Sequence, residues 1–262
     1  MSSDRSTTTK WADTPFALLK IPGQPGAQTC ENPGLLHIVA EMANAHNVLI
    51  RGLNAFYNQA PFVGIPSDVS DLMLYIAAWA DSVHHHHHLE ETLFFPDVEA
   101  AAKEASLTFD AQVNVEQHHD FEPKMADMVE WVKSVSDGKA TYGSEQLKRM
   151  VDSFAPILVQ HLHDEIGTLM VLEKCDGEKL RKAMNKVGET SAKTIDPYLV
   201  APLILGCGDR GYPGNRDFPP VPFFLPWLNA CWFERRHRGS WRFNPSDHWG
   251  YPRPLHFHSH DR

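Results

Sequence analysis

The sequence predicts an all-α protein: an antiparallel, up-down-up-down four-helix bundle with an irregular C-terminal extension rich in proline and tryptophan. Two observations support this prediction. Four long stretches carry apolar residues at helical spacing and are joined by short polar linkers, which is typical of such bundles. Beyond residue 194 the composition changes, because ten of the 19 prolines and four of the seven tryptophans lie in residues 194–262.

The four bundle stretches are residues 32–60, 67–103, 109–136 and 143–175. Asn32 followed by Pro33 suits the N-cap and first turn of the first helix. Proline lacks a backbone donor, so we expect Pro96 to kink or break the second helix and Pro123 to interrupt the third. Pro156 falls in the first half of the fourth helix.

The same stretches define the domain organisation. We expect a loosely held polar lead-in over residues 1–31, the bundle over residues 32–176 and a short additional helix over residues 177–193. Residues 194–262 are too aromatic for an ordinary disordered tail. We therefore expect them to pack on the bundle, as a lid or an extension.

Composition excludes several classes of protein. No apolar run approaches the roughly 20 residues of a membrane span. The net charge of −9 argues against a protein that binds nucleic acid by neutralising phosphates. The N-terminus has no apolar stretch of signal-peptide length, and the four scattered cysteines form no CxxC pair. We therefore expect a cytoplasmic protein with neither nucleic acid nor membrane as a partner; its oligomeric state stays open.

Histidine is the unusual feature of the composition. Eleven of the 16 histidines lie between residues 30 and 175, and histidine is the commonest metal ligand in proteins. Residues four apart share one face of a helix, so a histidine and a carboxylate at that spacing can reach one metal centre. The sequence repeats this pattern on three successive helices: His86 with Glu90, His118 with Glu122, and His161 with Glu165.

The pattern leaves more than one choice for some individual ligands. The first helix offers His46, with His37 as a weaker candidate. The run from His84 to His88 looks like an affinity tag, but it is internal and lies within a helical pattern. Because five consecutive residues cover more than one helical turn, we expect one or two of them to be ligands.

His119 and His163 are adjacent alternatives to His118 and His161, since a shift of one residue turns a side chain by about 100°. The sequence contains no HExxH motif, so it does not indicate a zincin. Mixed imidazole and carboxylate ligands suit iron or manganese, with zinc as a competitor. Two metal ions held together by bridging carboxylates would suit two-electron oxygen chemistry.

These residues resemble the hemerythrin-like (HHE cation-binding) family, and the fungal members with long additions in particular. The resemblance covers about residues 32–175, and its most specific part is the stretch from Glu90 to Pro96. It implies a non-haem di-iron centre with an oxo or hydroxo bridge, which manganese or zinc could replace. By the same resemblance, Glu90 and Glu165 would bridge the irons, and four histidines would be terminal ligands: His46, His86, His118 and His161.

The third helix departs from the oxygen-carrier pattern of that family. A second histidine four residues after the first is replaced here by Glu122. As a ligand, this carboxylate would stabilise ferric iron and bias the centre towards consuming dioxygen. Alternatively, Glu122 faces solvent.

Three functions compete at this point. The first is an oxidoreductase, an oxidase or oxygenase that uses dioxygen on a small organic substrate. The second is a protein that binds or senses oxygen, nitric oxide or iron reversibly, without turnover. The third is a structural protein in which the metal only stabilises the fold.

Overall fold

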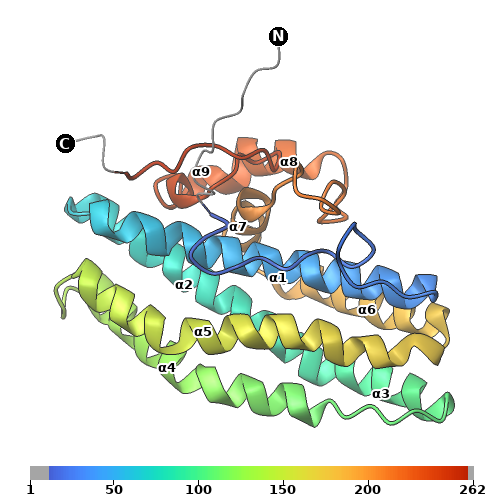
Figure 1. Ribbon diagram of the computed structural model, residues 1–262. Helices are drawn as coiled ribbons and strands as arrows, with labels where there is room; N and C mark the ends of the chain where they lie inside the picture. Colours follow the sequence, from blue (N-terminus) through green and yellow to red (C-terminus); the bar gives the residue numbers. More distant parts are fainter. Residues whose placement is uncertain (1–11, 259–262) are drawn as a thin grey trace.

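The computed structural model describes residues 12–258 and confirms the all-helical bundle (Figure 1). The bundle helices are α1 (Pro33–Gln59), α2 (Pro66–Leu89), α4 (Gln112–Ser136) and α5 (Ser144–Leu169). Successive helices run in opposite directions, and contacts of α1 with α2, α2 with α4, α4 with α5 and α5 with α1 close a ring around the core. Between residues 12 and 258 no strand forms; a single isolated bridge joins Ser246 and Pro252.

The start of α1 follows the predicted cap. The Asn32 side chain accepts hydrogen bonds from the backbone N–H groups of Gly34 and Leu35, and Pro33 occupies the first turn, where its missing N–H costs nothing. The Asn32 amide also donates to the carbonyl of Cys175 at 2.8 Å, beyond the end of α5. The Asn32 side chain thus caps α1 and also links the start of α1 to the segment that follows α5.

The second predicted helix is divided before Pro96. A π-helical turn (Glu90–Phe94) follows α2, and α3 (Phe95–Glu104) then begins with Pro96 in its first turn. The N–H of Phe95 donates to the carbonyl of Glu90, five residues earlier, which widens the helix by one residue. Such turns are frequent at functional sites, and this one begins at a predicted ligand.

The interruption expected at Pro123 is wrong, because α4 continues through it, as α5 continues through Pro156. Both prolines are exposed, so water can solvate the carbonyl groups that lose their helical donor. Buried neighbours such as Phe121 and Phe154 anchor the helices on either side. Packing of the apolar face therefore outweighs the local cost of proline.

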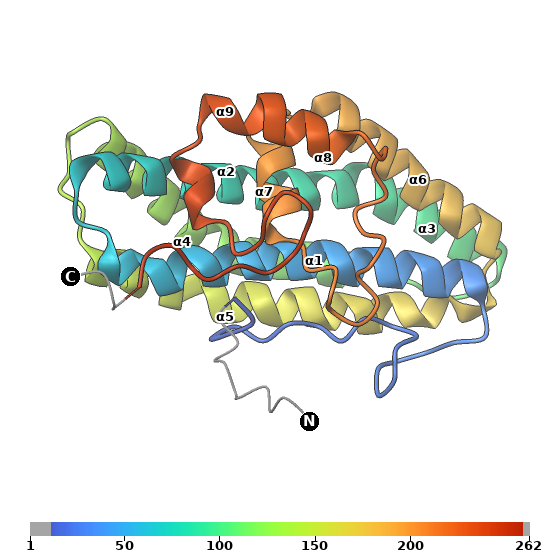
Figure 2. The same cartoon turned by 90° about the horizontal axis from the view of Figure 1, so that it is seen from above.

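The remaining helices cover one side of the bundle. The additional helix α6 (Gly177–Thr194) packs on α1, on α3 and on the π-helical turn, and α7 (Val200–Cys207) packs on α1 and α2. In the extension, α8 (Leu225–Leu228), a second π-helical turn (Asn229–Phe233) and α9 (Glu234–Arg236) form one continuous helical run, so this part is more helical than expected. The second π-helical turn of this run packs on α7, and Figure 2 shows the run on the side of the molecule away from α5.

Aromatic packing and ion pairs attach the extension to α2. The ring of Trp241 lies edge-on to Tyr75, with centroids 6.3 Å apart. The guanidinium of Arg242 donates at 2.8 Å to each of two α2 carboxylates, those of Asp68 and Asp71. The C-terminal extension therefore packs on the bundle.

The lead-in from residue 12 is held more firmly than expected, because asparagines of α1 bind its backbone. The Asn47 side chain both accepts from the N–H of Leu19 and donates to its carbonyl, at 2.8 and 2.9 Å. Asn54 accepts from the N–H of Phe16 and donates to the carbonyls of Ala12 and Phe16. Residues 1–11 lie outside the described part of the chain.

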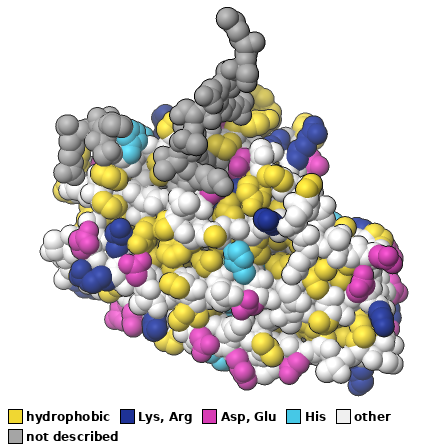
Figure 3. All heavy atoms as spheres, in the orientation of Figure 1, with side chains coloured by type: hydrophobic (Ala, Val, Ile, Leu, Met, Phe, Trp, Pro, Cys, Tyr) yellow, Lys and Arg dark blue, Asp and Glu magenta, His cyan; other side chains and the backbone are white. Residues whose placement is uncertain are grey.

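Acidic side chains are spread along the edge of the molecule formed by α4 and α5, as the net charge of −9 suggests (Figure 3). Among the described helices, none combines the length and the apolar character that crossing a lipid bilayer requires.

We predict that Asn54→Ala lowers the free energy of unfolding by about 2–4 kcal/mol, because it leaves buried backbone groups of the lead-in without partners. Asn185→Ala is the matched control, since Asn185 is an exposed residue of α6 and shares the change in helix propensity. Urea unfolding followed by circular dichroism measures both. Equal midpoints for the two variants would contradict the role assigned to Asn54.

Candidate metal centre

The centre of the bundle holds a polar cluster of seven side chains drawn from all four bundle helices and the π-helical turn. Its members are His46 of α1, His86 and His87 of α2, Glu90 at the turn, His118 of α4, and His161 and Glu165 of α5. Six of them are almost completely buried, and the side chain of His86 is 17% exposed. Apolar core residues surround the cluster along the bundle axis.

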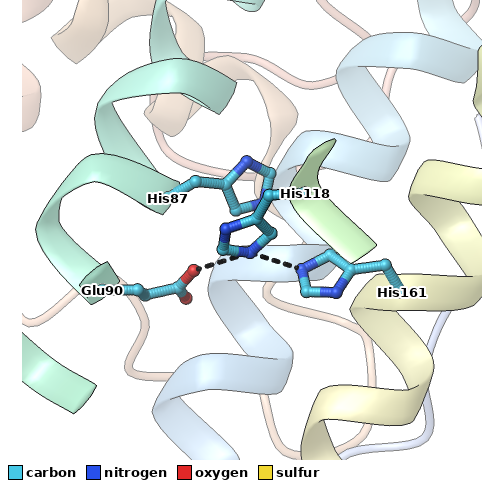
Figure 4. Close-up of side chains that lie close together, drawn as sticks. All are labelled: His87, Glu90, His118 and His161. Carbon is cyan, nitrogen blue, oxygen red and sulfur yellow. Dashed lines mark hydrogen bonds and ion pairs between the residues drawn. The ribbon is translucent and has the colours of Figure 1, made fainter. Parts of the chain in front are cut away.

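One group within the cluster combines three imidazoles with one carboxylate. Ligand atoms of His87, Glu90, His118 and His161 all lie within 4.8 Å of one another (Figure 4). The Nε2 atom of His118 is 3.8 Å from Oε2 of Glu90 and 3.0 Å from Nε2 of His161. A metal ion with nitrogen ligands at about 2.0–2.1 Å needs donors at such separations.

A second group shares Glu90 with the first. It combines Glu90 with His46 and His86, whose Nε2 atoms lie 4.0 and 3.0 Å from Oε1 of Glu90. Glu165 also spans the two groups, since its Oε2 is 3.3 Å from Nε2 of His46 and 3.9 Å from Nε2 of His161. Two carboxylates therefore lie between two sets of imidazoles.

Hydrogen bonds on the outer side of the cluster orient three of the imidazoles. Each Nδ1 has an oxygen acceptor: the Leu162 carbonyl for His46 at 2.7 Å, Glu91 for His118 at 2.6 Å, and Gln117 for His161 at 3.0 Å. With the proton on Nδ1, the Nε2 lone pair points into the cluster, as metal-binding histidines require.

This orientation of the rings decides which atoms meet in the contact between His118 and His161. Both Nδ1 atoms donate outward, so the two Nε2 atoms, 3.0 Å apart, face each other with lone pairs. Two acceptors at that distance repel each other unless a cation or a proton lies near both. The cluster also contains buried atoms without any hydrogen-bond partner, including both ring nitrogens of His87 and all four oxygens of Glu90 and Glu165. Such groups are costly to bury, and metal ions would satisfy them.

Burial and neighbouring side chains shift the pKa values of His87, His161 and Glu90 in the directions that favour metal binding. Burial lowers the pKa of His87 well below its usual range, and burial together with His118 lowers that of His161 to about 2. Burial opposes the ionisation of Glu90, but the surrounding histidines hold its pKa well below the usual value. Neutral imidazoles beside an ionised carboxylate are the protonation states that metal ligands adopt.

A proton remains on the other side of the cluster in the metal-free chain. Burial alone would lower the pKa of His46, but Glu165 and Glu90 raise it to about 9. Burial and the charge of Glu90 raise the pKa of Glu165. Incoming metal would therefore displace a proton from the pair formed by His46 and Glu165.

The structure brings together six of the seven residues predicted as ligands: His46, His86, Glu90, His118, His161 and Glu165. The structure also places His119 and His163, the adjacent alternatives to His118 and His161, outside the cluster. His119 is exposed, and His163 bonds through Nε2 to the carbonyl of Ala17 at 3.0 Å. His37 is in neither group.

The structure does not bring Glu122 to either group, and this residue is partly exposed. At about 100° per residue, the buried positions Asn114, Phe121 and Met125 all lie on one side of His118 around α4, whereas Glu122 lies about 40° to the other side. The buried face thus turns Glu122 away from the axis. The hypothesis that this carboxylate biases the centre towards consuming dioxygen loses its structural basis.

The sequence pattern does not single out His87 from the run of five histidines, although its spacing from Glu90 indicates a role. Around a helix, Glu90 lies about 40° from His86 and about 60° from His87, between the two. A carboxylate at that position can offer one oxygen to each neighbour. Only the packing of α4 and α5 against α2 shows that His87 also faces the cluster.

An open groove between α4 and α5 leads to the cluster. It has a volume of about 450 Å³ and is lined by Gln117, Asp120, Pro156, Ile157, Gln160 and His161. His161 is therefore shared between the groove and the cluster. The extension packs on α2, on the opposite side of the bundle, and does not cover this groove (Figure 1).

Comparison with known proteins agrees with this geometry. The family model described as the hemerythrin HHE cation-binding domain matches residues 37–172. The chain is 33% identical over 259 residues to the dimeric xanthone biosynthesis cluster protein R11 of Cryptosporiopsis sp. (strain 8999), covering 98% of this chain and 97% of that protein. No solved structure matches the chain significantly.

We predict that Glu90→Ala removes most bound metal, because Glu90 belongs to both groups, and abolishes the rise in melting temperature on metal addition. Glu122→Ala is the matched control, since it removes a carboxylate from outside the groups. Elemental analysis and thermal melts with and without Fe(II) or Co(II) measure the effect. Equal metal loss in both variants would contradict the assignment of the cluster.

Proposed function

Because this chain belongs to the hemerythrin HHE cation-binding domain family, we propose that its histidine–carboxylate cluster holds two iron ions and that the protein is a dioxygen-dependent oxidoreductase acting on a small organic substrate. The observation that carries the proposal is the pair of Nε2 atoms of His118 and His161, which face each other at 3.0 Å with both Nδ1 atoms committed elsewhere. Two lone pairs at this distance repel each other unless a cation or a proton lies near both, and a metal ion shared by the two rings would turn the contact into an attraction.

The position of Glu90 supports two metal ions. One of its oxygens approaches His46 and His86, and the other approaches His118. In this assignment His46 and His86 would hold one ion, and His87, His118 and His161 would hold the other. Glu90 and Glu165 lie between the two sets and could serve both ions.

The donor set suits iron. Five imidazole nitrogens and two carboxylates form a mixed set that iron and manganese prefer, and zinc could compete for it. When bound, a pair of iron ions supplies the electrons for reduction of dioxygen.

The chain's own residues hold the imidazoles in place. The carbonyl of Leu162 and the amide of Gln117 are neutral acceptors, whereas Glu91 is a carboxylate whose side chain is 33% exposed. A carboxylate acceptor raises the basicity of its imidazole more than a carbonyl does. His118 is therefore the most electron-rich of the oriented ligands.

The groove between α4 and α5 supports binding of a small organic molecule beside the cluster. Pro156 and Ile157 provide apolar surface, while Gln117, Asp120 and Gln160 provide hydrogen-bonding groups. Asp120 disfavours anions and favours hydroxyl donors. The relative named for dimeric xanthone biosynthesis supports a hydroxylated aromatic natural-product intermediate as the substrate.

We predict that His87→Leu lowers the affinity for one of the two metal ions by at least roughly 100-fold, since changing even the partners of ligands costs 10–100-fold. The metal-free variant should be as stable as the wild type or more stable, because it loses two buried nitrogens without partners. His88→Leu is the control, since His88 is exposed on the same helix. Metal titration and metal-free melts measure both effects; two intact sites in the His87 variant would remove His87 from the ligand set.

The proposed reaction predicts irreversible consumption of dioxygen. Anaerobic protein loaded with Fe(II) is exposed to dioxygen and then purged with argon, while an optical spectrum and an oxygen electrode are recorded, with and without a hydroxyxanthone as probe. We expect dioxygen uptake that argon does not reverse and that the probe accelerates.

A spectrum that appears with dioxygen and disappears on purging would overturn this proposal in favour of reversible binding or sensing. If zinc stabilises the fold as well as iron and no dioxygen is taken up, the metal has only a structural role. Glu90→Ala serves as the control without a metal centre.

A further inference from the structure

The helical run of the extension, from Leu225 to Arg236, turns apolar side chains towards solvent. Phe223 just before it is 89% exposed, and Trp227 and Trp232 within it are each 61% exposed. With these residues we define the aromatic stripe: Phe223, Phe224, Trp227, Leu228 and Trp232. Soluble monomers rarely present such a contiguous apolar surface without a binding role.

Apolar side chains lie on both faces of this helical run. A surface helix normally keeps them on its buried face, where Pro226 and Asn229 are buried and Phe233 is half-buried here. Phe224, Trp227 and Leu228 follow each other at helical spacing on the exposed side. Their exposure therefore results from the way the whole run is docked.

Contacts within the chain hold the two tryptophans in place without covering them. The ring of Trp227 lies edge-on to Trp249 at 4.9 Å, and the indole N–H of Trp232 donates to the hydroxyl of Tyr198 at 2.8 Å. Both side chains still expose more than half of their surface. The stripe is thus a fixed surface.

A cluster of positive charge continues from the stripe. Arg235, Arg236 and Arg238 are exposed, and between residues 12 and 258 none of them forms an ion pair. The chain as a whole has a net charge of −9, and many of its acidic side chains lie along the edge formed by α4 and α5 (Figure 3). The arginines therefore form a local basic surface on an acidic protein.

We propose that the aromatic stripe and these three arginines form a docking surface for an anionic lipid bilayer. Tryptophan and phenylalanine rings partition into the boundary between headgroups and acyl chains, and neighbouring arginines pair with lipid phosphates and carboxylates. Twelve helical residues span roughly 18 Å, too short to cross a bilayer, so the run lies in the plane of the surface. This inference departs from the expectation that the protein has no membrane partner.

Charge also favours a bilayer over a second copy of this chain. A symmetric contact through the stripe would bury the apolar side chains but would offer the arginines of each copy no opposite charge. An anionic bilayer instead complements both the apolar and the basic parts. Docking there would hold the protein where apolar aromatic compounds partition.

The test is cosedimentation of the full-length protein with phosphatidylcholine vesicles, with and without phosphatidylserine. We expect binding that requires phosphatidylserine and weakens with salt. The triple variant Arg235→Gln, Arg236→Gln, Arg238→Gln should bind roughly 100-fold more weakly, about fivefold for each arginine. Arg216→Gln, at another exposed arginine, should bind like the wild type.

The double variant Phe223→Ser, Trp227→Ser should also lose binding, whereas Val113→Ser, at a half-exposed valine of α4, should retain it. Circular dichroism and metal content, unchanged in all variants, exclude misfolding. Wild-type protein that stays in the supernatant with both vesicles would overturn the proposal. So would a lipid-free dimer in size-exclusion chromatography that the double variant dissociates, because the stripe would then bind a second copy.

Discussion

The buried carboxylate of Glu90 is the constraint on which the rest of the structure depends. A charged group in the middle of an apolar bundle is costly unless opposite charge or hydrogen-bond donors compensate it. In this chain, imidazoles from all four helices surround it, and a second carboxylate, Glu165, lies beside them. The order and direction of the bundle helices are what bring these side chains to one level of the axis.

The backbone around Glu90 departs from a regular α-helix. The π-helical turn starts at Glu90 itself, and Pro96 begins the helix that follows. The regular α-helix thus ends immediately after presenting His86 and His87, and Glu90 opens the π-helical turn. The additional helix α6 packs on both the turn and α3.

The two sides of the bundle have different surroundings. The asparagines of α1 bind the lead-in, and α6 packs on α1 and α3. The helix α7 packs on α1 and α2, and aromatic packing and the ion pairs of Arg242 attach the extension to α2. Between α4 and α5 the surface stays open and leads to His161. Additional segments therefore cover the side of the bundle formed by α1 and α2, whereas the side formed by α4 and α5 stays accessible to small molecules.

The sequence by itself determined the helical bundle, its N-cap at Asn32 and six of the seven side chains expected at the centre, because helical periodicity and spacing of four residues are local properties. Only the tertiary structure decided between His118 and His119, turned Glu122 outward and brought His87 inward. Those outcomes depend on the rotation of each helix about its axis, which the packing of residues such as Phe121 and Met125 sets. The same holds for Pro123, whose local preference was overridden by the burial of its neighbours. The exposure of apolar side chains along the run from Leu225 to Arg236 likewise became visible only once its docking on the bundle was known.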